Sequence, residues 1–196
     1  MKKVLLAVVM FAMVFAAVPV FAENSYVSLR AGAFSPNSDD NGLKDFDTGY
    51  NVEVAYGYKI MPNFAVEGGI GRYSAEYSET IYGVSYSSTA SVIPITATAK
   101  GILPIADDQF ELYGGAGIGL YMATAEAEAA GVSMSYDANA FGFHVVGGAD
   151  FNVSDNIAIG GEVKWVSVEP EFDVLGVKYD TPYGGIIFNA GVTYKF

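Results

Sequence analysis

The chain has 196 residues, of which 52% are hydrophobic and 16% are charged; it contains 13 Phe, 14 Tyr and no cysteine. The aromatic content excludes an intrinsically disordered chain, and the lack of cysteine excludes disulfide and zinc–cysteine scaffolds. Nucleic-acid binding needs a basic surface, whereas 22 acidic residues here outnumber 10 basic ones and give a net charge of −12.

Residues 1–22 have the three parts of a secretory signal peptide. Lys2 and Lys3 form a basic start, residues 4–18 are apolar, and Val20 and Ala22 place small residues before a cleavage site. The apolar run is shorter than the roughly 20 residues of a membrane-spanning helix. We therefore expect an exported protein with a signal peptide at 1–22 and one domain at 23–196.

Beyond the signal peptide, apolar residues alternate with polar or small residues in eight segments. In 47–59, for example, Tyr50, Val52 and Val54 share one face, and Asn51 and Glu53 share the other. Period two is typical of a β-strand with two unlike faces. The eight segments are 26–34, 47–59, 64–73, 88–100, 110–122, 138–151, 157–168 and 183–196.

The connections between these segments alternate in length. Short turns with Pro, Asn or Asp lie at 59–63, 102–109 and 152–156, and four long polar links lie at 35–47, 74–87, 123–137 and 169–182. Membrane barrels have short periplasmic turns and long external loops. The sequence thus favours an all-β, eight-stranded antiparallel up-and-down transmembrane barrel, although a soluble sandwich or lipocalin-like barrel shows the same alternation.

Aromatic residues at both ends of the apolar faces favour the membrane barrel. They match the two interfacial girdles of such barrels, and only a closed barrel satisfies every strand hydrogen bond in lipid. The predicted interface residues are Tyr58, Phe64, Phe110 and Phe151 near the short turns, and Tyr50, Phe141 and Trp165 toward the long links.

The last strand carries a further pattern, with Phe188, Val192 and Tyr194 at alternate positions before the final Phe196. It resembles the assembly signal of bacterial outer-membrane barrels. The whole chain is similar to the small eight-stranded outer-membrane β-barrel family, which includes the OmpA-type, OmpX-type and opacity-type barrels. This resemblance implies a Gram-negative outer-membrane location, contact with outer-membrane lipid, lipopolysaccharide and the barrel-assembly machinery, a monomer, and no cofactor.

Strand parity also predicts charged residues inside the barrel. An interior of eight strands has room for side chains or one small ligand, and unpaired charges there are costly. The expected network is either a polar plug that fixes the barrel or the lining of a narrow, porin-like channel for small solutes. Its residues are Arg30, Glu53, Glu67, Lys100, Glu111, His144, Asp150, Glu162 and Lys164.

Other motifs point less strongly to chemistry. His144 is the only histidine, and Val146 stands where a His-x-Ser pair of a lipid A-modifying enzyme needs serine. The loop 37–42 approaches a calcium-loop pattern but lacks its first Asp and its closing Glu. Paired glycines at 68–69, 114–115, 147–148, 160–161 and 184–185 are typical of close approach within strands. We expect a non-enzymatic structural or surface-interaction protein with acidic external loops.

Overall fold

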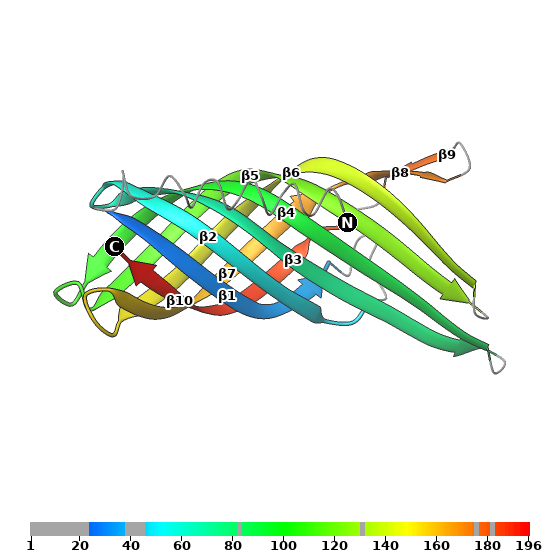
Figure 1. Cartoon of the computed structure of the whole chain (residues 1–196), viewed down its shortest axis with the longest axis horizontal. Coiled ribbons are helices and arrows are strands. Elements are labelled where there is room, and N and C mark those ends of the chain that lie inside the picture. The colour runs from blue at the N-terminus through cyan, green and yellow to red at the C-terminus, as the bar shows by residue number, and fades with distance from the viewer. Residues whose placement is uncertain (1–23, 38–45, 82–83, 130–131, 175–176, 181–182) are drawn as a thin grey trace.

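The computed structural model describes residues 24–37, 46–81, 84–129, 132–174, 177–180 and 183–196. The predicted signal peptide at 1–22 and most of the calcium-like loop lie outside these residues. Among the described residues, no helix is long and apolar enough to cross a membrane. The described chain forms ten strands (Figure 1).

Eight of these strands form the barrel, and two short strands form a separate hairpin. The barrel strands are β1 (Ser25–Pro36), β2 (Gly49–Met61), β3 (Phe64–Ile81), β4 (Val84–Ile105), β5 (Phe110–Ala129), β6 (Val132–Asn152), β7 (Ile157–Val168) and β10 (Gly185–Lys195). The hairpin consists of β8 (Glu171–Val174) and β9 (Val177–Asp180).

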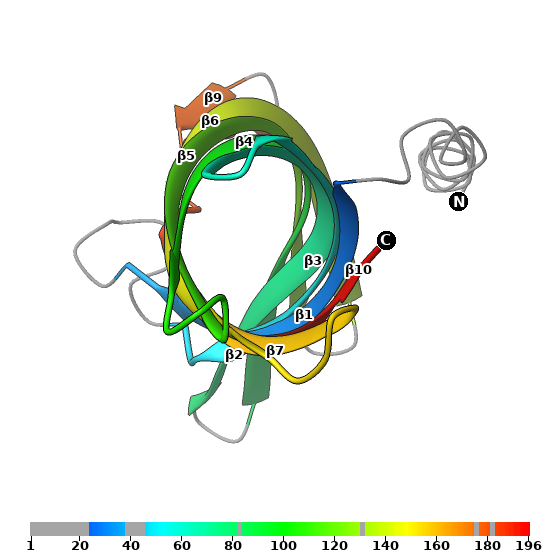
Figure 2. The same ribbon diagram turned by 90° about the vertical axis from the view of Figure 1, so that its left-hand side faces the viewer.

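Each barrel strand pairs antiparallel with its neighbour in the chain, and β10 closes the ring against β1 (Figure 2). In the closing pair, Tyr26 lies opposite Lys195 and Phe34 lies opposite Ile187. The predicted all-β fold with eight antiparallel strands in a closed barrel is therefore confirmed.

The predicted long links at 74–87 and 123–137 are wrong, because most of these residues belong to strands. β3 and β4 remain paired up to Ile81 and Val84, and β5 and β6 up to Ala129 and Val132. The alternation continues through both stretches, but mostly with Ser, Thr or Glu at every second position. The fourth link, 169–182, likewise contains the β8–β9 hairpin.

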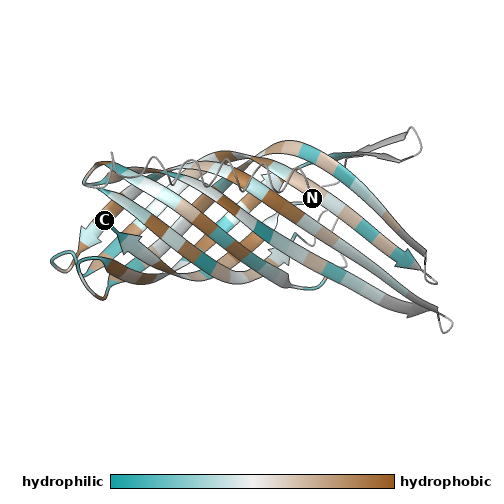
Figure 3. Cartoon of the chain, viewed as in Figure 1, coloured by the Kyte–Doolittle hydropathy of each residue, from teal (hydrophilic) through white to brown (hydrophobic). Residues whose placement is uncertain are grey.

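Hydrophobic residues recur among more polar ones along the barrel strands (Figure 3), and many of the large hydrophobic ones are exposed on the outward face. Leu29, Ile118 and Phe143 are all at least half exposed there, which is the arrangement expected of a wall that faces lipid. Of the predicted interface aromatics, Tyr58 and Phe151 are partly covered, and the others are exposed: Tyr50, Phe64, Phe110, Phe141 and Trp165. Phe188, Val192, Tyr194 and Phe196 also point outward and are about half exposed.

The interior is layered along the barrel axis. A small apolar group of Tyr26, Ala65 and Ile102, packed against Tyr113, lies toward the short turns. A larger apolar cluster lies toward the other end, and charged residues lie between the two. The larger cluster consists of Phe34, Tyr73, Ala75, Ala90, Val92, Tyr121, Ala123, Ala138, Val166, Val168, Tyr183 and Ile187.

Candidate functional site

Six of the predicted interior residues converge in one group, which we call the central cluster. It is built from β1, β2, β3, β4 and β7, because inward-facing positions of neighbouring strands meet inside so narrow a barrel. Its members are Arg30, Glu53, Glu67, Lys100, Glu162 and Lys164.

Arg30 is the most highly connected member of the central cluster. Its Nη1 and Nη2 donate to the two carboxylate oxygens of Glu67 at 3.1 and 3.0 Å, and Nη1 also donates to Glu53 at 3.1 Å. Its Nε lies 3.6 Å from Glu162 Oε2. The planar guanidinium thus binds one carboxylate in a bidentate manner while facing two more, which lysine cannot do.

The two lysines pair with the same three carboxylates. Lys100 Nζ lies 2.9 Å from Glu67 and 3.3 Å from Glu162, and Lys164 Nζ donates to Glu53. Glu162 Oε1 accepts no hydrogen bond from the described residues, but it lies 3.7 Å from Lys164 Nζ. Every member is therefore in an ion pair.

The central cluster is electrically balanced and almost completely buried. Its three cations and three carboxylates are between 3% and 6% exposed. Charges so far from water are tolerated only when each is compensated, and removal of one partner leaves an uncompensated buried charge. The two apolar groups lie on either side of the central cluster.

His144 lies next to the central cluster, but its partners are neutral. Its Nε2 is 2.8 Å from Thr98 Oγ1, its Nδ1 is 3.3 Å from Tyr121 Oη, and the residue is fully buried. Strand parity thus places His144 inside as expected, while Thr98 and Tyr121 were not among the predicted site residues. They come from β4 and β5, and only the register shows that they meet β6 here.

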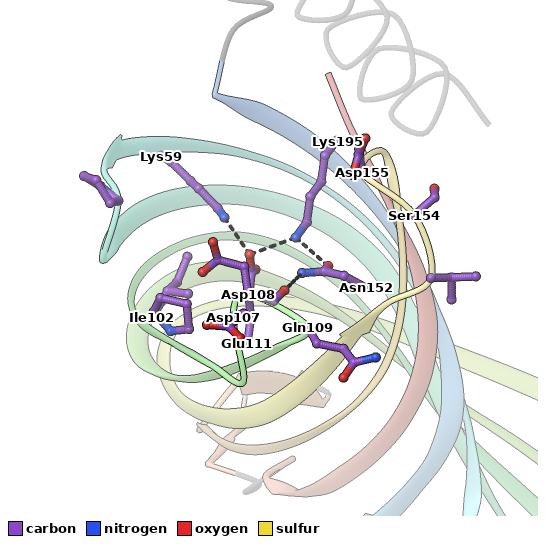
Figure 4. A pocket seen from close by; sticks show the side chains of 13 residues that line it. Lys59, Ile102, Asp107, Asp108, Gln109, Glu111, Asn152, Ser154, Asp155 and Lys195 are labelled. Atoms are coloured by element: carbon purple, nitrogen blue, oxygen red, sulfur yellow. Dashed lines mark hydrogen bonds and ion pairs between the residues drawn. The ribbon is translucent and has the colours of Figure 1, made fainter.

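Glu111 does not join the central cluster but lies at the mouth of the barrel beside the short turns. Its Oε1 accepts from Lys59 Nζ at 3.0 Å and from Lys195 Nζ at 2.8 Å (Figure 4). Lys59 and Lys195 were absent from the predicted network, although both lie in segments that the sequence predicts as strands with one inward and one outward face. Asp150, also predicted, lines the same mouth, together with Arg30, Lys100 and Tyr113.

Beyond the barrel, β3 to β6 continue as a four-stranded external sheet. We define it as residues 75–81, 84–90, 125–129 and 132–136, which lie past Ser74, the last residue of β3 with a partner on β2. Figure 1 shows these four strands extending well past the rest of the barrel. Most residues of two predicted loops therefore belong to a hydrogen-bonded sheet.

Side-chain polarity in the external sheet is the reverse of that in the barrel wall. One cross-strand row, Ala75, Ala90, Ala125 and Tyr136, faces inward and belongs to or packs against the larger apolar cluster. The next row faces outward and is polar, with Glu76, Thr89, Glu126 and Ser135. The outward face of the external sheet is therefore suited to water, whereas the outward face of the barrel wall is suited to lipid.

Both outer edges of this region lack a ladder partner among the described strands; β3 has none on the β2 side beyond Ser74, and β6 carries the longer of the two unpaired edges. β7 pairs with β6 only from Gly142 onward, so residues 132–141 have β5 on one side and, among the described strands, no ladder partner on the other. β8 lies beside β6 but pairs with β9. Ten extended residues at about 3.3 Å each give this edge a length of about 33 Å.

Comparison with known proteins agrees with this architecture. A family model described as "Outer membrane protein beta-barrel domain" matches residues 4–196. A search of curated protein sequences gives no match. Solved structures do match, at low sequence identity, so the likeness concerns the fold.

Three of these structures illustrate the likeness. OprG from Pseudomonas aeruginosa is 12% identical with a TM-score of 0.63, over 90% of this chain and 97% of that one. Neisserial surface protein A (NspA) is 16% identical with a TM-score of 0.60, over 89% and 98% of the two chains. Ail of Yersinia pestis, solved with the heparin analogue sucrose octasulfate, is 17% identical with a TM-score of 0.56, over 88% and 97%.

Proposed function

The chain belongs to the outer membrane protein beta-barrel domain family, and from that premise we propose that it is a non-enzymatic surface protein whose external sheet binds an extended segment of a partner polypeptide. The unpaired edge of β6 carries this proposal. A free edge presents a row of N–H and C=O groups with which a further strand can pair.

The side chains along this edge suit one kind of partner. Ser135, Asp137 and Asn139 face outward, and the same outward face carries the exposed carboxylates of Glu126 and Glu128. An added strand that places basic side chains on this face gains favourable electrostatics and a faster encounter. The partner chemistry is therefore an extended, basic polypeptide segment.

The central cluster has a different role in this proposal. We infer that it is a polar plug, because its charges cancel and its side chains are covered on all sides. A plug keeps the barrel wall rigid, so that the external sheet is held at a fixed height above the membrane. The burial of all six side chains supports the plug rather than the lining of a solute path.

A shortened hairpin tests the role of the β6 edge. In one variant, Asn-Gly replaces residues 125–136, which removes the β5–β6 part of the external sheet and joins the paired residues Thr124 and Asp137 by a two-residue turn. The matched control replaces residues 75–90 by Asn-Gly, which removes the β3–β4 part of the external sheet and joins the paired residues Ser74 and Ser91. Both are reconstituted in lipid nanodiscs and titrated with a lysine-rich, strand-forming 12-residue peptide.

We expect the β5–β6 truncation to weaken peptide binding by at least tenfold and the β3–β4 truncation by less than threefold, with binding that falls as salt rises. Heat-modifiable migration on gels reports that each variant still forms the barrel. Equal losses in the two variants, or an intact barrel that does not bind the peptide, would contradict the proposed function.

Planar-bilayer recordings test the plug against a narrow channel for small solutes. The plug predicts no reproducible conductance steps for the unmodified protein. Steps that change in size in Glu53→Gln or Arg30→Ala would show that ions pass the central cluster, and the interior would then be a solute path.

Mass spectrometry of lipid A tests the non-enzymatic part of the proposal. Cells that overproduce the protein should contain unaltered lipid A. A new acylation or deacylation product that disappears in His144→Gln would instead assign the interior an enzymatic role.

A further inference from the structure

The mouth of the barrel beside the short turns contains a recess of about 660 Å³, on the opposite side of the membrane from the external sheet (Figure 4). Its walls are the turns that join β4 to β5 and β6 to β7, with Pro62 and Pro104 beside them. Its volume lies within the range of small-ligand pockets, about 300–1,000 Å³. Neither the family nor the proposed function assigns it a ligand.

Two ammonium groups line the floor of the recess. Lys59 and Lys195 share a single carboxylate, that of Glu111, and Lys195 also donates to Asn152 Oδ1 at 2.7 Å. An ammonium group has three N–H donors. Beyond these bonds, Lys59 retains two donors and Lys195 one, and Asp150 lies close by as a second carboxylate.

The rim of the recess is negatively charged. Asp107 and Asp108 lie on one wall and Asp155 on the other, and all three are exposed. Two cations and four carboxylates, including Glu111, line the recess in all. A ligand that suits it therefore carries an anionic group toward the floor and a cationic group at the rim.

The backbone of one wall is held in a strained conformation. Ala106, Asp107 and Asp108 have φ values of 53°, 53° and 64°, which are unfavourable for residues other than glycine. Asn152 Nδ2 donates to the carbonyl oxygen of Asp108, and the Gln109 N–H donates to that of Ala106 at 3.1 Å. Such conformations persist where the surroundings fix them, and they cluster at binding sites.

We propose that this recess binds the zwitterionic end of a short peptide, with its carboxylate on Lys59 and Lys195 and an ammonium group against Asp107 and Asp108. Short peptides that carry both groups are part of the cell-wall layer beneath the outer membrane, and free diamino acids present the same chemistry. We expect the peptide to bind more tightly, because a recess of this size also covers its neighbouring residues.

The experiment uses the full mature protein in lipid nanodiscs and four probes. These are a tripeptide that ends in a diamino acid with a free carboxylate, the same peptide as its C-terminal amide, the same peptide acetylated on its side-chain amine, and free lysine. Binding is followed by isothermal titration calorimetry and by NMR shifts of labelled residues in the two turns. The intact tripeptide should bind saturably, and both blocked peptides should bind more weakly.

Two sets of variants locate the two contacts. Lys59→Met with Lys195→Met should weaken the intact tripeptide about threefold to tenfold and leave the amide unaffected, since the amide has already lost that contact. Asp107→Asn with Asp108→Asn should weaken the intact tripeptide by a similar factor and leave the acetylated peptide unaffected, since that peptide has already lost the ammonium contact. Asparagine tolerates the left-handed backbone of this turn. Arg72→Met, an exposed change at the far end of the barrel, is the matched control.

Glu111→Gln gives a change in the opposite direction. It frees both ammonium groups and should tighten binding of the intact tripeptide but not that of the amide. The proposal is overturned if the tripeptide and its amide bind equally, or if the lysine variants leave the affinity unchanged. Equal affinities for free lysine and the tripeptide would assign the same recess to free diamino acids. None of these results depends on the β6 edge.

Discussion

The four strands of the external sheet, β3 to β6, also form part of the eight-stranded barrel wall, yet the two regions place opposite kinds of residue outward. In the wall, Ile118 and Phe143 point away from the barrel and Lys100 points inward; in the external sheet, Glu126 points outward and Ala125 inward. The strands cross this boundary without a break. The polarity of each face thus follows the surroundings of the sheet, lipid in one region and water in the other.

The two regions also differ in what holds their inner faces together. The central cluster relies on compensated charge, while the inner face of the external sheet relies on small apolar side chains packed against Tyr73 and Tyr121. Removal of a charge should therefore destabilise the central cluster most. Introduction of a buried polar group should destabilise the external sheet most. Free energies of unfolding in lipid vesicles, followed by the fluorescence of Trp165, the only tryptophan, measure each effect.

The largest expected effect is that of Arg30→Ala. The change leaves three buried carboxylates with two lysines, and it should lower the free energy of unfolding by about 3–5 kcal/mol. Arg72→Ala removes the same charge from an exposed position near the external sheet, where a change of less than about 0.5 kcal/mol is expected. Similar losses for the two variants would mean that the central cluster does not depend on charge balance.

The next effect concerns the outward faces. Ile118→Lys places a charge on the apolar face near the middle of the wall and should cost about 2–4 kcal/mol, whereas Thr89→Lys on the polar face should be nearly neutral. Unfolding in the same vesicles compares the two. A neutral Ile118→Lys would show that this face does not contact hydrocarbon.

The inner face of the external sheet gives a smaller effect. Ala90→Asn buries an amide among apolar side chains and should cost about 1–3 kcal/mol, while Thr89→Asn, one residue away on the outward face, should change the stability by less than about 0.5 kcal/mol. Amide hydrogen exchange of β4 and β5 separates local loosening of the external sheet from loss of the barrel. Equal effects at 89 and 90 would contradict the reversal of polarity.

The smallest expected effect has the opposite sign. Ala106 has a φ of 53°, so Ala106→Gly should relieve strain and raise the free energy of unfolding by about 0.5–1 kcal/mol. Denaturant unfolding measures the gain. A loss of stability would show that the unfolded-state entropy of glycine outweighs the strain at this turn.

Much of the barrel could be predicted from the sequence, because period two survives wherever bulky and polar residues alternate. The segment 157–168 predicts β7 with the bounds that the structure shows, and the strand number, the closed barrel and the outer-membrane family are confirmed. The external sheet was mistaken for loops, since Ala alternating with Ser, Thr and Glu, as in 123–129, has little hydrophobic contrast.

The interior could be predicted in composition but not in arrangement. The alternation along each strand places Arg30, Glu53 and Lys164 inside. Which inward side chains lie at the same height depends on the stagger between strands, and only the register of the structure gives that stagger. Glu111 was grouped with these residues for that reason, although it pairs with Lys59 and Lys195 at the mouth. The apolar layers were missed because Tyr73 and Tyr121 were not assigned to the interior.

The pairing of β1 with β10 has a consequence for how the protein reaches this structure. These strands come from the two ends of the described chain, and contacts so distant in sequence form slowly, because the entropy of the intervening chain is lost first. Until they pair, both strands keep open edges that hydrocarbon cannot satisfy. Membrane insertion and ring closure should therefore be coupled late steps, and an inserted sheet that lacks either strand should not accumulate.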